Sequence, residues 1–168
     1  MSNIQFTPHF ELREFVVSKT ARDHGFDNTP PAEAVENLRA LCVHTLEPLR
    51  EALGLPIVIT SGYRTRELNR LLVCHSNKSQ HMSGEAADFV VQGSKFKVQG
   101  ESRRELLIKA FKTMILDERI TFDQLIIYPT FIHVSYVRSG RKNRSKLTRA
   151  FANGSYAALT RAQALSLE

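Results

Sequence analysis

The chain has 168 residues, of which 42% are hydrophobic and 24% charged, and this size and composition exclude a disordered chain and favour one globular domain. There is no run of about 18 apolar residues and no basic stretch followed by an apolar core, so we expect neither a membrane span nor a secretory signal. The two cysteines exclude a disulfide framework, and the formal net charge of +6 indicates an anionic partner or surface.

The first part of the chain is predicted to be mostly helical. Apolar residues at helical spacing predict a short helix within residues 10–24, and a longer pattern with the same period covers residues 34–54. Pro48 should disturb this second helix locally, because it lacks a backbone N–H. A β-branched strand follows at residues 56–60, and Thr65 can cap the next helix.

The second part alternates strands with helices and loops. In chain order, the sequence predicts a polar loop, a strand, a polar insert, a helix and two strands joined by a short turn, over residues 75–84, 86–91, 93–100, 102–116, 122–128 and 131–137. The hairpin-length gap makes the last two strands antiparallel neighbours. This order indicates an α+β fold with a small, mainly antiparallel sheet flanked by helices.

Positive charge is concentrated at the C-terminal end. Residues 1–137 hold 16 basic and 16 acidic residues, whereas residues 138–168 hold seven basic residues and one acidic residue. We therefore expect a single domain over 1–137 and a basic extension over 138–168. The extension could hold an anionic cell-wall polymer, a membrane surface or nucleic acid, or be a solvated, partly mobile tail. Nucleic acid is the least favoured partner, because no aromatic pattern of an RNA-binding module accompanies the basic residues.

Asp88 lies in an energetically costly place. It interrupts an apolar strand between Ala87 and Phe89, where a free carboxylate would lose its hydration. Such a group is normally paired, hydrogen-bonded, neutralised or bound to a metal. The preceding polar loop contains His81, and a turn at Gly84 would let this imidazole fold back towards the carboxylate.

His133 also lies within an apolar strand. A single histidine in a strand is most often a hydrogen-bonded structural residue, and a histidine such as His81 in a polar loop is unremarkable by itself. Together with Asp88, the two imidazoles provide a donor set that zinc uses in proteins. Three protein ligands leave a fourth position for water, which is typical of a catalytic site rather than a structural one.

Three segments resemble peptidase family M15, which includes zinc D-Ala-D-Ala carboxypeptidases and endolysin-type L,D- or D,D-peptidases. Residues 79–88, Ser-Gln-His-Met-Ser-Gly-Glu-Ala-Ala-Asp, match the family signature SxHxxGxAxD. Residues 61–64, Ser-Gly-Tyr-Arg, followed by Asn69, resemble its SGYR…N segment, and residues 132–135 resemble its terminal HxS strand. The three segments also occur in the order that the family shows.

The resemblance implies a fold like that of hedgehog domains and D-Ala-D-Ala peptidases, in which His81, Asp88 and His133 bind Zn²⁺. It also implies that Arg64 contacts the substrate and the negative charge that develops during hydrolysis; without the motif, Arg64 would be interpreted as an ordinary surface ion pair. The implied substrate is a peptidoglycan stem peptide. A phage- or prophage-type lysin, made in the cytoplasm and acting at the cell wall after release, fits these implications.

One position departs from the family pattern. Members commonly carry Glu or Asp, as the general base, three residues before the last zinc-binding histidine, and Thr130 occupies that place here. A threonine hydroxyl cannot take up a proton near neutral pH. Glu85, Asp123 and His75 are alternative bases, although each is more simply explained as solvated or structural. The departure leaves open a second function, a catalytically weak cell-wall binding module on the same zinc fold.

Overall fold

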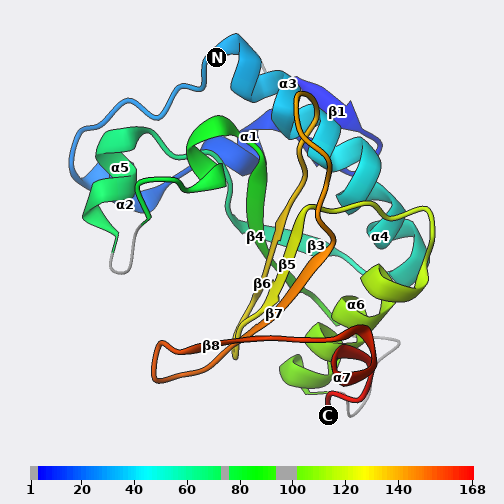
Figure 1. Ribbon diagram of the computed structural model, residues 1–168. Coiled ribbons are helices and arrows are strands. Elements are labelled where there is room, and N and C mark those ends of the chain that lie inside the picture. The colour runs from blue at the N-terminus through cyan, green and yellow to red at the C-terminus, as the bar shows by residue number, and fades with distance from the viewer. Residues whose placement is uncertain (1–3, 73–75, 94–101) are drawn as a thin grey trace.

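The computed structural model describes residues 4–72, 76–93 and 102–168, and Figure 1 shows how their helices and strands are arranged. His75 and most of the polar insert expected over 93–100 lie outside these ranges. The elements are, in chain order, β1 (Gln5–Thr7), β2 (Phe10–Glu11), α1 (Leu12–Val16), α2 (Lys19–Asp23), α3 (Ala32–Leu41), η1 (Cys42–Leu46), α4 (Glu47–Leu53), β3 (Ile57–Ser61), α5 (Arg66–Leu71), η2 (Gln80–Ser83), β4 (Ala86–Val91), α6 (Arg103–Leu116), β5 (Gln124–Ile127), β6 (Ile132–Ser135), β7 (Lys146–Ala150), β8 (Tyr156–Ala158) and α7 (Arg161–Leu165).

Six strands form the main sheet, in the spatial order β3-β4-β6-β5-β7-β8. Neighbouring strands are antiparallel except β5 and β7, which run parallel. β1 and β2 form a separate antiparallel pair. The fold is therefore α+β, with a small antiparallel sheet and a larger, mixed sheet flanked by helices, which confirms the predicted class.

The two faces of the main sheet carry different side chains, because successive strand residues point to opposite faces. Phe89, Leu125 and Ile132 belong to the hydrophobic core, which also includes the apolar side of α6. The strand register pairs Asp88 with His133 on β4 and β6, so these two side chains lie side by side on the opposite face. One face thus stabilises the fold, and the other is free to carry polar side chains.

The N-terminal segment differs from the single helix expected over residues 10–24. Phe10 and Glu11 pair with β1, and the remainder forms two short helices, α1 and α2. Ser18 divides these helices because its backbone is extended, and its side chain accepts a hydrogen bond from the Ala21 N–H as the N-cap of α2. The helical spacing was correct, but this capping serine interrupts the helix.

The helix expected over 34–54 forms as α3, η1 and α4, and Pro48 disturbs it as predicted. η1 is a π-helix that ends just before Pro48. Proline cannot donate the backbone hydrogen bond that would reach the carbonyl of His44. That carbonyl accepts the Thr121 N–H at 3.0 Å instead, which joins this helix to the segment before β5. Gly54, with a φ of 60°, ends α4.

The basic segment over 138–168 is a folded part of the same sheet, rather than an extension beyond it. β7 pairs in parallel with β5, and β8 pairs with β7. Ala164 of α7 and Leu167 join the hydrophobic core. The charge count could not show this, because the charged residues of β7 belong to the same strand as Thr148 and Ala150, which are buried. Within the described residues, no helix is long and apolar enough to cross a membrane.

Candidate metal centre

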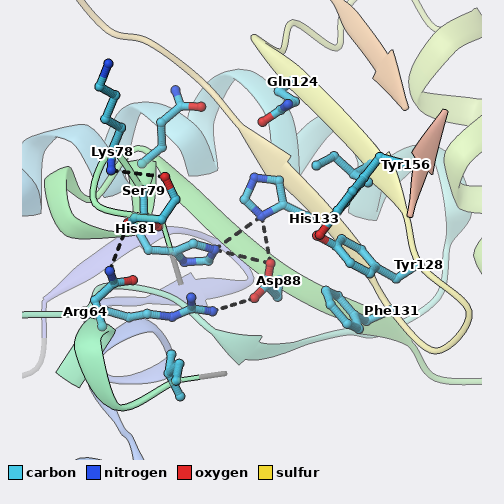
Figure 2. Close-up of a pocket in the computed structure, with 15 residues that line it drawn as sticks. Arg64, Lys78, Ser79, His81, Asp88, Gln124, Tyr128, Phe131, His133 and Tyr156 are labelled. Carbon is cyan, nitrogen blue, oxygen red and sulfur yellow. Dashed lines mark hydrogen bonds and ion pairs between the residues drawn. The ribbon is translucent and has the colours of Figure 1, made fainter. Parts of the chain in front are cut away.

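The three expected metal ligands meet on the outer face of the sheet (Figure 2). Asp88 and His133 are directly opposite each other on β4 and β6. His81 comes from η2, the short 3-10 helix that precedes β4. Gly84 ends this helix with a φ of 72°, and the resulting turn brings His81 back to the carboxylate as expected. Segments distant along the chain therefore form one cluster.

The spacing of the three side chains fits a single metal ion. One ligand atom from each residue lies within 4.8 Å of the others. Asp88 Oδ1 is 2.8 Å from His133 Nδ1 and 3.3 Å from His81 Nε2, and the two nitrogens are 3.2 Å apart. Ligands bound tetrahedrally to zinc at about 2.0–2.1 Å are separated by roughly 3.3 Å. The cluster could therefore hold a metal with little rearrangement.

The protonation of His81 suits a metal ligand. Its Nδ1 lies 2.7 Å from the carbonyl oxygen of Gly62, to which it can only donate. In the neutral ring, Nε2 then carries a lone pair and faces the cluster. Burial lowers the pKa of His81, against the opposing effect of the Asp88 charge. The ring is therefore neutral near pH 7, with its acceptor nitrogen directed at the site.

Asp88 is ionised and held from two sides. Burial raises the pKa of Asp88, but its interactions with the two imidazole rings outweigh this effect, so the pKa lies well below its usual range. Arg64 donates to Asp88 Oδ2 at 2.7 Å and to the Ser61 hydroxyl at 2.9 Å. Arg64 thus lies beside the cluster and orients the carboxylate that faces the two histidines.

Two glycines of the family motifs are required by close packing. A Cβ on Gly62 would lie 2.5 Å from the Phe15 carbonyl oxygen, and one on Gly84 would lie 2.4 Å from that of Ala34. Real side chains do not approach a backbone oxygen so closely. Gly62 and Gly84 therefore let the loop before α5 and the turn after η2 pack against α1 and α3, and both segments position His81.

The cluster lies in a cavity of about 510 Å³. Its lining is mostly polar and comes from β4, β5, β6 and β8 and from neighbouring segments: Arg64, Asn69, Leu72, Ser76, Lys78, Ser79, Gln80, His81, Asp88, Gln124, Ile126, Tyr128, Phe131, His133 and Tyr156. All four side chains singled out from the sequence, Arg64, His81, Asp88 and His133, belong to this one cavity. Its size suits a short peptide segment.

An aromatic wall, formed by Tyr128, Phe131 and Tyr156, faces the cluster across the cavity and was not predicted (Figure 2). The rings of Tyr128 and Phe131 are stacked with their centroids 4.2 Å apart. The hydroxyls of Tyr128 and Tyr156 lie 3.1 Å apart. The alternation of Gln124, Ile126 and Tyr128 along β5 could have placed Tyr128 on the face of His133. No sequence pattern indicated Tyr156, which arrives from the end of the sheet.

The expected substitute bases are not in the cavity. Asp123 accepts hydrogen bonds from the Arg144 guanidinium, and Glu85 accepts from Arg141 at 3.2 Å. Neither carboxylate lines the cavity, and neither does Thr130, which is exposed in the turn between β5 and β6. His75 is outside the described residues. Asp88 is therefore the only carboxylate among the described residues of the lining, and it belongs to the cluster.

Comparison with known protein families gives a match to the family described as Peptidase M15, over residues 8–118. The matched range includes Arg64, His81 and Asp88, and it ends before His133. No curated protein matches the chain. The match covers well over half of the sequence, and within it lie both motif glycines and two of the three clustered side chains. The chain belongs to the peptidase M15 family of metallopeptidases.

Proposed function

We propose that this protein is a zinc-dependent hydrolase that cuts peptide bonds in peptidoglycan stem peptides, as a D-Ala-D-Ala carboxypeptidase or as a cell-wall endopeptidase. The observation that carries this proposal is the convergence of two imidazole nitrogens and one carboxylate oxygen within 4.8 Å in a polar cavity. The protein would act at the cell wall after release from the cytoplasm, as a phage or prophage lysin does.

His81, Asp88 and His133 would hold the zinc ion and leave one position open to the cavity. Zinc bound in this way lowers the pKa of its water to about 7, which supplies hydroxide near neutral pH. Arg64 has five N–H donors, and its contacts with Asp88 and Ser61 use only part of them. The remaining donors can hold a substrate carboxylate or the negative charge that develops on the carbonyl oxygen.

Tyr128 would donate a hydrogen bond from the opposite wall. Burial and the contact with the Tyr156 hydroxyl raise the pKa of Tyr128, so the phenol stays protonated in the working pH range. Of the two hydroxyl protons in the pair, one joins the two oxygens, and the other is available to a ligand. The pair can therefore donate to a substrate carbonyl or to a leaving amine, and it cannot serve as a base near neutral pH.

The charge of the cavity supports a substrate that carries a carboxylate. Arg64 and Lys78 are cations in the lining, and the single carboxylate in its described part, Asp88, is already occupied by its neighbours. A cavity of this charge attracts the anionic end of a peptide. Peptidoglycan stem peptides end in a carboxylate, which agrees with the proposal.

A second candidate function is favoured by the missing carboxylate base. A general base is typically worth about 10²–10⁴-fold in rate. The usual position holds Thr130, and both Glu85 and Asp123 are paired with arginines outside the cavity. A protein of this kind could bind stem peptides through its metal and cut them only slowly, as a binding module of the cell wall.

The test is peptide release from purified peptidoglycan, and from a synthetic peptide ending in D-Ala-D-Ala, with zinc-loaded and chelator-treated protein. The proposal expects release that depends on zinc and is lost in His133→Ala but kept in His24→Ala, which removes an exposed histidine of the N-terminal region. Equal release with and without zinc would reject metal catalysis. Zinc-dependent binding of the peptide without release would favour the binding module.

A further inference from the structure

η2, which presents His81, has little stability of its own. It has only four residues, Gln80–Ser83, and short 3-10 helices have poor internal hydrogen-bond geometry. Within this segment, the Met82 N–H donates to the Ser79 carbonyl and the Gly84 N–H donates to the His81 carbonyl. The Glu85 N–H donates to the Gln80 carbonyl at 3.0 Å. The place of such a segment must therefore come mainly from contacts with the rest of the protein.

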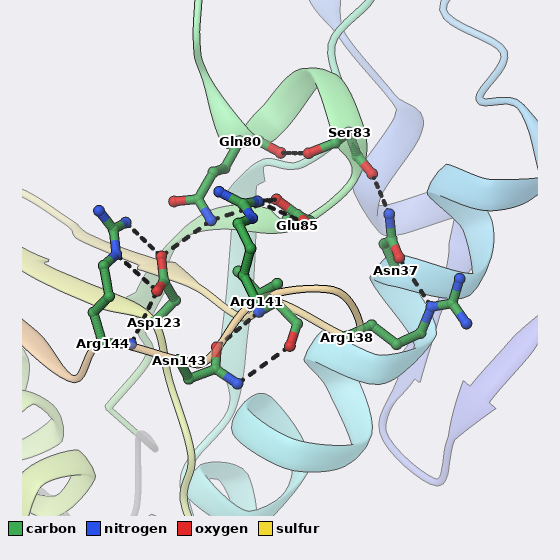
Figure 3. A network of polar contacts seen from close by, with 10 residues as sticks. Asn37, Gln80, Ser83, Glu85, Asp123, Arg138, Arg141, Asn143 and Arg144 are labelled. Carbon is green, nitrogen blue, oxygen red and sulfur yellow. Dashed lines mark hydrogen bonds and ion pairs between the residues drawn. The ribbon is translucent and has the colours of Figure 1, made fainter.

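The loop over residues 138–144 supplies three of these contacts, each through an arginine (Figure 3). The first runs through Asp123. Its buried carboxylate accepts the backbone N–H of Arg144 at 3.0 Å, the Nε of Arg144 at 2.9 Å and one of its terminal nitrogens at 2.5 Å. Asp123 Oδ2 also accepts the side-chain amide of Gln80 at 3.2 Å, which connects Arg144 to the start of η2.

The other two arginines reach the end of the same segment. Arg141 donates to both carboxylate oxygens of Glu85, at 3.2 and 3.5 Å. Arg138 donates from Nε to Asn37 Oδ1 at 3.0 Å, and the Asn37 amide donates to the Ser83 carbonyl at 2.9 Å. Arginines of this one loop therefore bond to both ends of the η2 segment, either directly or through one intervening side chain.

The loop is itself fixed to the sheet. The Asn143 side chain accepts the Val137 N–H at 2.8 Å and donates to the Val137 carbonyl at 3.2 Å, which closes residues 137–143 into a compact loop. The Lys146 N–H at the start of β7 donates to the Asp123 carbonyl at 2.9 Å. The arginines thus start from a well-anchored part of the backbone.

We propose that Arg138, Arg141 and Arg144 are positioning residues that hold η2, and with it His81, in place for the metal. The inference rests on the proposed metal site, and it gives the buried acids Asp123 and Glu85 a role as anchors. It also changes the interpretation of the basic C-terminal segment, because three of its seven basic residues bond to side chains of the same protein instead of to an external partner. The loop lies beyond the matched family range, so this part of the chain completes the site.

The experiment compares Arg144→Ala and Arg141→Ala with Lys142→Ala, which removes the same charge from an exposed position of the same loop. Zinc affinity is measured on the full chain by competition with a chelator. The absorption spectrum of the cobalt-loaded protein reports the ligand geometry. We expect the two arginine variants to lose about 2- to 5-fold in zinc affinity and to change the cobalt spectrum, with partial recovery in Arg144→Lys. Lys142→Ala should match the wild type in both measurements.

Amide hydrogen exchange of the metal-free proteins separates this inference from the proposed function. The Gly84 and Glu85 amides should exchange several-fold faster in Arg144→Ala and Arg141→Ala than in Lys142→Ala, while amides of α6 should be unchanged. Unchanged exchange of these two amides, or zinc affinities equal to that of Lys142→Ala, would overturn the positioning role. A wild-type protein that binds no zinc would overturn the metal site alone, since the exchange comparison needs no metal.

Discussion

The backbone carbonyl of Gly62 lies 2.7 Å from Nδ1 of His81 and fixes the orientation of the imidazole. In return, the backbone N–H of Arg64 donates to the His81 carbonyl at 3.2 Å. Because both contacts use main-chain atoms, the direction of the His81 ring depends on the backbone of two loops. Small changes of the backbone in either loop should therefore affect the metal centre.

Gly84→Ala tests this dependence. The substitution places a Cβ 2.4 Å from the Ala34 carbonyl oxygen and requires a φ of 72°, so we expect a loss of at least about 2 kcal/mol in the free energy of unfolding, together with weaker zinc binding. Gly154→Ala is the control, because Gly154 also has a positive φ but has no atom within 4 Å of the new Cβ. Urea unfolding of the metal-free proteins measures the free energy of unfolding of both variants. Equal losses would show that the contact with α3 contributes nothing.

The lowered pKa of His81 predicts a pH dependence of stability. In the unfolded chain this residue takes up a proton near its usual pKa of about 6.5, whereas the folded protein takes it up only at lower pH. The free energy of unfolding of the metal-free protein should therefore fall as the pH drops below about 6.5. His81→Gln should show a smaller fall, and the exposed control His24→Gln should behave as the wild type. The measurement is urea unfolding near pH 7.5 and near pH 5.5. An equal fall in the free energy of unfolding between these pH values for all three proteins would contradict the expectation.

Arg64→Lys keeps the positive charge but loses the planar pair of donors. We expect kcat to fall by about 10²–10³-fold, the cost of removing a donor to developing negative charge, with a smaller change in KM. Arg66→Lys, at an exposed position at the start of α5, should leave both constants unchanged. The measurement is hydrolysis of the synthetic stem peptide under zinc saturation. An unchanged kcat in Arg64→Lys would assign this residue to structure only.

Tyr128→Phe keeps the stacked ring on Phe131 and removes the hydroxyl. If this hydroxyl donates to the reacting group, kcat should fall by about 10²-fold while zinc affinity stays the same. Tyr156→Phe acts on the same hydroxyl pair, so the double variant should lose little more than the worse single one. Additive losses in this double-mutant cycle would mean that the two hydroxyls act separately. Tyr136→Phe, at a tyrosine outside the cavity lining, is the control.

Thr130→Glu restores the residue type expected of the family at this position, but the structure predicts no gain. Thr130 is exposed in the turn between β5 and β6 and does not line the cavity. Turnover should therefore stay within about twofold of the wild type, well below the 10²–10⁴-fold effect of a working general base. A large gain in peptide release would instead favour the binding module as the function of the unaltered protein.

The metal cluster could be predicted from the sequence because its residues are unusual in their local context and because the family motifs select the same three residues. Asp88 interrupts an apolar strand, His133 interrupts another, and the turn at Gly84 allows His81 to return. Strand alternation and capping also gave most element positions correctly. Thr65, for example, caps α5 by accepting the Leu68 N–H, as predicted.

The remaining parts of the site could not be predicted, because they depend on pairings between distant segments. Tyr156 reaches the cavity only because β8 pairs with β7 and β7 with β5. Arg144 lies 21 residues after Asp123, and nothing in either segment indicates that the two meet. A count of charges treats such arginines as solvated, whereas the folded backbone brings them to buried acids.

The parallel pairing of β5 with β7 has a practical consequence for any protein shortened after residue 137. Such a chain would leave β5 at the edge of the sheet, with the backbone groups that bond to β7 unpaired, and it would remove Ala164 and Leu167 from the core. Unprotected edges of this kind recruit strands from other molecules and promote aggregation. A shortened protein that precipitates or loses activity would therefore report a broken sheet rather than a lost anchor to the cell wall.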